Sequence, residues 1–256
     1  MKENNNKPNS KYYNNKQIDS ICNVLTDAYT EKKLEEGKVI TQIDIDDFVI
    51  NVLGCTIVYE NIASDQMDED VEDADCMGFS SDGIQELPVI RDGKLEWVLF
   101  PKDTIVIDNY LKNPKMANKR RFTIAHEAGH IIKNRMSGQV CAEYNHVGGV
   151  VLTSAPAMRK RYSFHEVEAN NFAASLLMPE CMVAMLMHKY YGGKSIVKYA
   201  DDILDGEDVK KIYFMSQILG VSYEAMFYRL KHLGYLIDGE LAAYIEDNVV
   251  GNSEDE

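Results

Sequence analysis

The sequence RRFTIAHEAGH, residues 120–130, contains the motif H-E-x-x-H, in which Glu127 directly follows His126 and His130 closes the motif. Residues four apart lie on one face of a helix, so the two imidazoles can reach one cation at about 2.0–2.1 Å. Glu127 lies beside the helix face that carries the two histidines, where it can accept the proton of a water that attacks a substrate carbonyl. The flanking residues FTIA and II are apolar, which favours a buried helix. The stretch therefore predicts a metal-binding helix that carries its own general base.

A catalytic metal site of this kind needs a third protein ligand and one open position for water. Glu166, 36 residues after the second histidine, is the candidate, because Asn170 follows it by one helical turn and can accept a hydrogen bond from a metal-binding histidine. Three alternatives stay open. Ser163 and Glu166 also match a capping box, and Glu168 or His165 could be the ligand instead. Two hydrogen-bonded core histidines, or an exposed face of His and Glu, would need no metal.

The elements around the motif predict an α+β fold, because short apolar runs precede the motif and helices follow it. Asp92-Gly93, between two apolar runs of residues 87–100, predicts a hairpin with a type I′ turn. Two further strands are predicted at residues 55–60 and 103–108. The segments with helical patterns are 17–36, 41–53, 113–136, 163–178, 180–191, 207–219 and 223–233.

Composition divides the chain into four segments. Residues 1–16 are rich in Asn and Lys and are predicted to be a disordered tail. Residues 17–136 should hold N-terminal helices, a small sheet and the active-site helix. Residues 137–245 should form a helical part that supplies the third ligand, and residues 246–256 an acidic tail.

The overall charge and the absence of long apolar runs restrict the class of protein. The net charge of −14 argues against nonspecific binding to nucleic acid or anionic lipid, which both need a basic face. The N-terminus lacks the apolar core of a signal peptide, and no run approaches 18 apolar residues, so no membrane contact is expected. The five cysteines are scattered and never spaced C-x-x-C, which favours free thiols in a reducing cytoplasm.

Two segments together carry a resemblance to a known family. RRFTIAHEAGHII followed by EVEANNFAASLLMP resembles the ImmA/IrrE family of metallopeptidases, and MSQILGVSYEAMFYRLKHLGYL is similar to that family's segment downstream of the site. The resemblance covers about residues 100–235. It implies a zincin-like core, similar in architecture to thermolysin, with Glu127 as general base. Asn170 stands where the wider gluzincin pattern E-x-x-x-D has Asp. The residues that match the family's Zn²⁺ ligands are His126, His130 and Glu166.

The resemblance also implies a substrate class. Known members of the family relieve repression by cleaving, or otherwise inactivating, a helix-turn-helix repressor. A cytoplasmic zinc endopeptidase with such a repressor as its protein partner is therefore the expected function. An oxyanion in this reaction needs a further donor, for which Tyr162, His146 and Arg161 are candidates, and strand 103–108 could bind an extended substrate if it lies at a sheet edge.

Two other functions fit parts of the sequence. ILGVSYEAMFYRLKHLGYL has the shape of a DNA-binding helix-turn-helix, and its second helix carries Arg229, Lys231 and His232. Glu224 and many apolar residues on that helix favour a packing helix pair instead, so we expect no direct contact with nucleic acid. A zinc-containing antirepressor that acts by binding alone is the second alternative, because its Glu127 would look the same.

Overall fold

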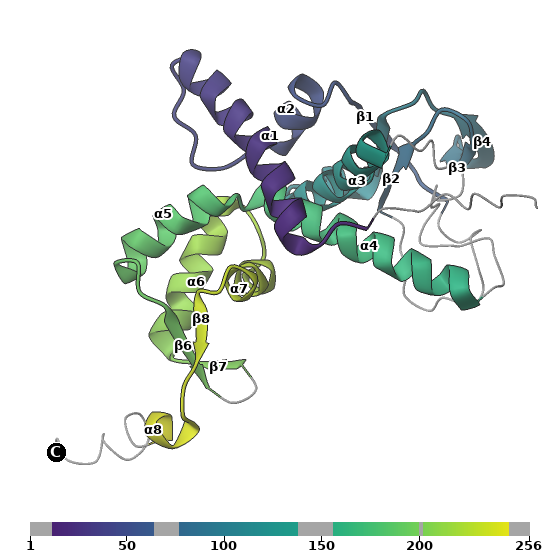
Figure 1. Cartoon of the computed structure of the whole chain (residues 1–256). Helices are drawn as coiled ribbons and strands as arrows, with labels where there is room; N and C mark the ends of the chain where they lie inside the picture. Colours follow the sequence, from purple (N-terminus) through teal and green to yellow (C-terminus); the bar gives the residue numbers. More distant parts are fainter. Residues whose placement is uncertain (1–11, 64–76, 138–155, 200–201, 246–256) are drawn as a thin grey trace, which may run out of the picture.

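The computed structural model of the chain describes residues 12–63, 77–137, 156–199 and 202–245, and these form an α+β fold with α3 and α4 crossing near its centre (Figure 1). The helices are α1 (Asn15–Glu35), α2 (Ile45–Asn51), α3 (Ala117–Ser137), α4 (Pro156–Leu177), α5 (Glu180–Tyr191), α6 (Gly206–Leu219), α7 (Tyr223–His232) and α8 (Leu241–Ile245), with 3₁₀ turns η2 (Asn109–Lys112) and η3 (Pro114–Met116). The strands are β1 (Thr56–Glu60), β2 (Gly78–Ser81), β3 (Glu86–Arg91), β4 (Lys94–Leu99), β5 (Thr104–Asp108), β6 (Ile196–Tyr199), β7 (Ile203–Leu204) and β8 (Leu236–Asp238).

The sheet beside α3 has the strand order β1-β5-β2, with β1 parallel and β2 antiparallel to β5. The strand predicted at residues 103–108 is confirmed as β5, but it does not lie at a sheet edge, because it pairs with β1 on one side and β2 on the other. An edge is formed instead by β2, which the sequence did not predict. A Cβ atom on Gly78 would lie 2.7 Å from Cγ2 of Thr123, so β2 packs directly on α3.

The predicted hairpin over residues 87–100 is confirmed as β3 and β4. Asp92 and Gly93 have φ angles of 51° and 72°, and a type I′ turn requires positive φ at both positions. A bridge between Ile62 and Val89 joins the hairpin to the chain after β1. The buried side chains of this small second core are Ile62, Phe79, Leu87, Val89, Phe100 and Val106.

The helix that carries the H-E-x-x-H motif begins near Asn113-Pro114, as predicted. Asn113 caps η3 by accepting the amide hydrogen of Lys115, and the chain continues from η3 into α3. The second predicted helix starts earlier than expected, since α4 begins at Pro156, seven residues before Ser163. A capping residue stands at the start of a helix, so Ser163 cannot cap α4 and the capping-box explanation of Glu166 is wrong.

Three further details of the fold differ from the sequence prediction. Asn14 caps α1 in a capping box with Gln17, and Tyr13 is buried, so the fold begins within the predicted tail of residues 1–16. Asp44 caps α2 in place of the predicted Thr41. The C-terminal part is not purely helical, because β6 pairs with both β7 and β8 in a small sheet that was not predicted.

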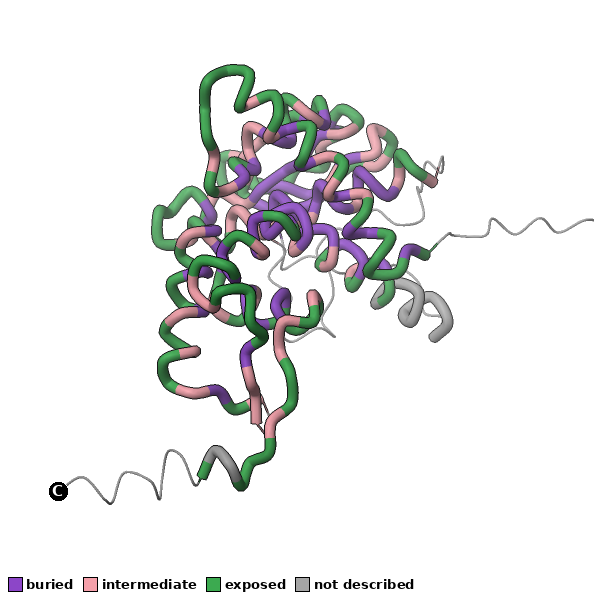
Figure 2. Tube along the Cα trace, turned by 60° about the vertical axis from the view of Figure 1, so that its left-hand side comes forward, coloured by how far each residue is buried: buried purple, intermediate pink, exposed green. Residues whose placement is uncertain are grey.

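Most of the buried hydrophobic residues form one continuous core that runs from β5 through α3 and α4 to α1 and to the helices α5, α6 and α7, and Figure 2 shows them inside the fold. No helix among the described residues is long and apolar enough to cross a membrane. The closest helix contact in this core is between α3 and α4, and it passes through Gly129 of the H-E-x-x-H motif. A Cβ atom there would lie 2.7 Å from Cβ of Phe172 and 3.2 Å from the carbonyl oxygen of Ala169. Gly129 therefore sets how near the histidines of α3 come to α4.

We expect Gly129→Ala to lower the free energy of unfolding by about 1–3 kcal/mol, because the added methyl group would force the two helices apart. Gly206→Ala is the matched control, since a Cβ atom at this helical position meets no atom within 4 Å. The control should be neutral or stabilise by up to about 1 kcal/mol. Urea unfolding of both variants measures the effect, and equal midpoints for the two would contradict this packing argument.

Candidate metal centre

Three side chains from α3 and α4 converge on one point. The Nε2 atoms of His126 and His130 lie 3.2 Å apart. The two carboxylate oxygens of Glu166 lie 3.1 Å from Nε2 of His126 and 3.3 Å from Nε2 of His130. Ligand atoms that surround a tetrahedral ion at about 2.0–2.1 Å are about 3.3 Å from one another, so these separations fit a zinc site. The structure thus brings together the three residues that the sequence predicts as ligands.

Asn170 orients the first histidine. Its Oδ1 lies 2.9 Å from Nδ1 of His126, and an amide oxygen only accepts, so Nδ1 carries the proton. In the neutral imidazole the lone pair of His126 is then on Nε2, which faces Glu166 and His130. The spacing of Glu166 and Asn170 predicts this contact. A hydrogen bond to the ring nitrogen that does not bind the metal holds a metal-binding histidine in its orientation.

The charges of the cluster shift the pKa values of its members. Burial alone would lower the pKa of His126, but the hydrogen bond to Glu166 and the nearby carboxylates raise it to about 9. Burial alone would raise the pKa of Glu166, but the hydrogen bonds and charges of the two histidines hold it below its usual range. The three residues form a polar site in which an anion and two imidazoles already face one another.

Glu127 lies beside the cluster and is only 6% exposed. Burial raises the pKa of its carboxyl, while the two histidines and a hydrogen bond with Ser80 act in the opposite direction. Ser80 belongs to β2, so the edge strand helps to orient the carboxylate. Sequence reasoning missed this contact, since β2 is a short Gly- and Ser-containing segment with no strong strand signal.

The alternative ligands Glu168 and His165 belong to a separate buried cluster. Lys133 donates to both of them, and Glu168 also accepts the amide hydrogen of Tyr13 at 2.6 Å. These contacts direct Glu168 toward the start of α1, and the group of possible metal ligands in the described residues does not include it. Of the candidates in this part of α4, only Glu166 joins the two histidines.

The three candidate oxyanion donors cannot be placed in the site. His146 lies outside the described residues, and the side chains of Arg161 and Tyr162 on α4 do as well. Their proposed role stays a prediction from the sequence.

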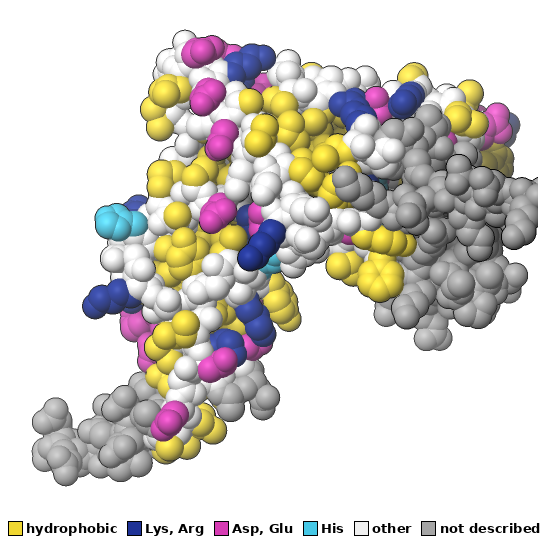
Figure 3. Space-filling view, viewed as in Figure 1, with side chains coloured by type: hydrophobic (Ala, Val, Ile, Leu, Met, Phe, Trp, Pro, Cys, Tyr) yellow, Lys and Arg dark blue, Asp and Glu magenta, His cyan; other side chains and the backbone are white. Residues whose placement is uncertain are grey.

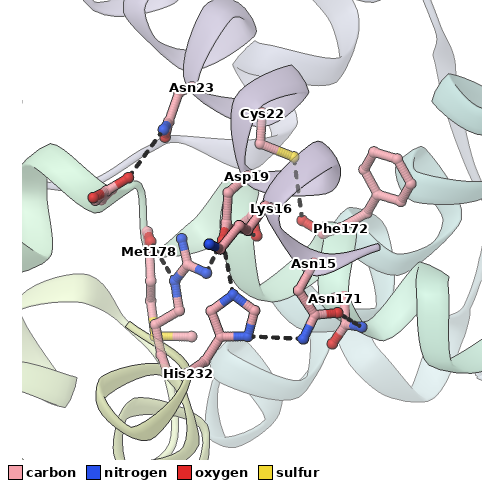
Figure 4. Close-up of polar contacts among 12 residues, drawn as sticks. Asn15, Lys16, Asp19, Cys22, Asn23, Asn171, Phe172, Met178 and His232 are labelled. Carbon is pink, nitrogen blue, oxygen red and sulfur yellow. Dashed lines mark hydrogen bonds and ion pairs between the residues drawn. The ribbon is translucent and has the colours of Figure 1, made fainter. Parts of the chain in front are cut away.

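The helix pair α6–α7 packs against the rest of the fold. Met226 and Leu230 of α7 are fully buried. The three basic residues that would serve DNA binding each contact an aspartate: Arg229 and His232 contact Asp19 at 2.6 and 2.7 Å, and Lys231 contacts Asp202 at 2.8 Å. Figure 4 shows His232 pointing toward Asp19 of α1. These contacts favour a packing role, and the expectation that the chain binds no nucleic acid stays a prediction.

Comparison with protein families agrees with this geometry. The model of the IrrE N-terminal-like domain, which defines peptidase family M78, matches residues 102–231. This chain belongs to the IrrE N-terminal-like family. The match confirms the resemblance to ImmA/IrrE proteins and spans α3, α4 and the helix pair α6–α7. Membership in a peptidase family supports a metallopeptidase, and the cluster of His126, His130 and Glu166 is where this member could hold its metal.

Comparison with individual proteins adds little. A Mycobacterium tuberculosis transcriptional regulator is similar in structure with a TM-score of 0.40 and 13% sequence identity. The alignment covers 84% of this chain and 46% of the regulator, so this IrrE-like chain spans less than half of that protein's length. No curated protein matches the sequence.

Proposed function

We propose that this protein is a zinc-dependent endopeptidase. Its ion would be held by His126, His130 and Glu166, with Glu127 as the general base. The observation that carries the proposal is the separation of 3.1–3.3 Å among the two Nε2 atoms and the Glu166 oxygens, which matches the spacing of ligands around zinc. Three protein ligands leave a fourth position for water, as catalytic zinc sites require.

The residues of the chain have distinct parts in the proposed reaction. Zinc, when bound, would polarise the scissile carbonyl and lower the pKa of water toward about 7. Glu127 accepts the proton of the attacking water and passes it to the leaving amine. Its buried position raises the pKa of the carboxyl, which suits a group that must both take and release a proton. Asn170 keeps His126 in the tautomer that can bind metal.

An extended substrate would lie along β2. This strand pairs with β5 on one side only and forms an edge of the described sheet. It also contacts Glu127 through Ser80. A peptide that adds to this edge by main-chain hydrogen bonds would pass next to the general base. β2 thus takes the part that the sequence analysis gave to residues 103–108.

The proposed substrate is a helix-turn-helix transcriptional repressor whose cleavage relieves repression in the cytoplasm. This part of the proposal is based on membership in the IrrE-like family and on the resemblance to ImmA/IrrE metallopeptidases. It requires that the protein recognise a folded regulator or an exposed linker of one.

The test mixes the purified protein with the helix-turn-helix repressor encoded nearest to its own gene. Fragments are sought by mass spectrometry with the wild type, with added chelator and with Glu127→Gln. Fragments that appear only with the metal-loaded wild type support the endopeptidase. Release of the repressor from its operator by Glu127→Gln, without any fragment, would instead identify an antirepressor that acts by binding.

Zinc binding should become tighter as the pH rises. Metal binding requires a neutral imidazole, and the pKa of His126 is raised to about 9, so this residue is protonated at pH 7 in the metal-free protein. Zinc must therefore displace about one proton, and its affinity should rise about tenfold per pH unit up to pH 9. Competition with a chelating dye from pH 6.5 to 8.5 measures this slope. A flat profile would mean that His126 does not bind the ion or is already neutral.

A further inference from the structure

A cavity of about 660 Å³ lies next to the metal centre, between the start of α3, the middle of α4 and the helix α7. It shares a wall with the centre, because Asn170 lines the cavity and also accepts a hydrogen bond from His126. Phe122, another lining residue, has its ring centre 6.4 Å from that of His126. These two side chains connect the cavity to His126 of the candidate metal centre.

The cavity has a charge opposite to that of the whole protein. The chain has 41 acidic and 27 Lys or Arg residues, yet no carboxylate lines the described cavity. Lys115 and Lys119 line it one helical turn apart, both are exposed, and neither forms an ion pair with any described residue. On the face drawn in Figure 3, by contrast, acidic and basic side chains are interspersed over the described surface. The two lysines give the cavity a positive charge that no described carboxylate offsets.

The inner wall of the cavity is held rigid by a polar network that joins α1, α4 and α7. Asn15 donates to Nδ1 of His232 at 3.1 Å, and Nε2 of His232 donates to Asp19 at 2.7 Å. The Asp19 carboxylate also accepts from Arg229, whose side chain is only 2% exposed. Figure 4 shows Asn15 between His232 and Asn171. Nη2 of Arg229 has no acceptor in the described chain, so the network keeps one donor unused.

The rest of the lining combines the polar side chains of Asn118, Asn170, Ser175 and Ser222 with a group of apolar ones. Phe122, Ala174, Val221, Ala225 and Tyr228 surround the space between the lysines and the inner network. A mixed lining of this kind fits an apolar side chain that is followed by negative charge, since apolar groups would be buried against the aromatic rings and carboxylates would face the lysines. A purely apolar ligand would leave the two lysines unused, and a small inorganic anion would leave the apolar wall uncovered.

We propose that this cavity binds the substrate segment beside the scissile bond and selects a bulky apolar residue with acidic neighbours. The proposal rests on the proposed peptidase function, because the shared wall with the metal centre is what places a substrate there. It makes Lys115 and Lys119 specificity-determining residues. Phe122 and Tyr228 provide the apolar contact.

The test measures peptide binding without cleavage. Two short fluorescein-labelled peptides are identical except that a central Phe is flanked by Glu in one and by Lys in the other. Fluorescence anisotropy follows their binding to the full chain carrying Glu127→Gln. We expect the acidic peptide to bind about tenfold more tightly, with a preference that weakens as salt is added. Equal affinities for the two peptides, or no binding of either, would overturn the proposal.

Charge-reversed variants assign the preference to the cavity. Lys115→Glu/Lys119→Glu should remove the preference or reverse it. Lys94→Glu/Lys194→Glu is the matched control, since it makes the same change in net charge at exposed lysines that do not line the cavity. The control should keep the preference within about twofold. An equal loss in both variants would mean that overall charge, and not the cavity, selects the peptide. The milder pair Lys115→Gln/Lys119→Gln serves if the charge-reversed protein does not fold.

Measurements of cleavage and of peptide binding together distinguish an error in the cavity proposal from an error in the peptidase proposal. If the wild type cleaves peptides with no enrichment of acidic neighbours and the two labelled peptides bind equally, the peptidase stands and the cavity inference is wrong. If the acidic peptide is preferred but zinc-loaded wild type cleaves nothing, the cavity is a binding site and the peptidase proposal is wrong.

Discussion

Glu127→Gln will lose proteolysis while the protein keeps its metal. The carboxamide has nearly the shape of the carboxylate but cannot accept the proton of the attacking water, so the rate should fall by at least about 10²–10⁴-fold. Glu127 lies outside the ligand cluster of His126, His130 and Glu166, so zinc content should not change. The measurement compares fragment formation by mass spectrometry with zinc per chain by elemental analysis.

Two controls make this result specific. Glu35→Gln makes the same chemical change at an exposed position of α1 and should leave the rate as it is. Ser80→Ala removes the hydrogen bond from β2 to Glu127 and should slow cleavage less than Glu127→Gln does, because the base is then present but less well oriented. If Glu127→Gln cleaves at the rate of the wild type, another group is the base and the proposed mechanism is wrong.

The candidate metal centre could be predicted because its signals are local. Two imidazoles four residues apart share a helix face wherever that helix lies, and the same rule applied to Glu166 and Asn170 selects the carboxylate of α4 that the structure places beside both histidines. The rival Glu168 has a partner that no local rule reveals, because Lys133 lies on another helix and reaches it only when α3 and α4 cross. Local periodicity therefore predicts which three side chains converge but not what the other side chains contact.

The parts that the sequence did not predict depend on pairing between distant segments. β2 is only the four residues GFSS, which carry no strand pattern, and it exists because β5 and α3 hold it from two sides. β6 pairs in parallel with β8, 40 residues later, so neither strand is evident alone. The cavity beside Asn170 arises for the same reason, since its walls come from three helices that are separate in the sequence.

Glu166→Ala will lose zinc. Changes in residues that only orient a ligand weaken metal binding by about 10–100-fold, so removal of a direct ligand should weaken it by more than about 100-fold. Asn170→Ala should weaken zinc binding by only about 10–100-fold, because it leaves all three ligands in place but frees the His126 ring. Glu168→Ala is a poor control, since it would leave Lys133 buried without an acceptor, so Glu168→Gln is used because its amide oxygen can still accept from Lys133.

Thermal unfolding gives a readout that does not depend on cleavage. An ion that binds only the folded chain stabilises it by about 2.7 kcal/mol when its concentration is 100 times its dissociation constant. Zinc should therefore raise the melting temperature of the wild type and of Glu168→Gln, and it should leave Glu166→Ala nearly unchanged. If Glu166→Ala gains as much stability from zinc as the wild type while Glu168→Gln gains none, the third ligand is Glu168. The convergence of His126, His130 and Glu166 would then not mark the metal site.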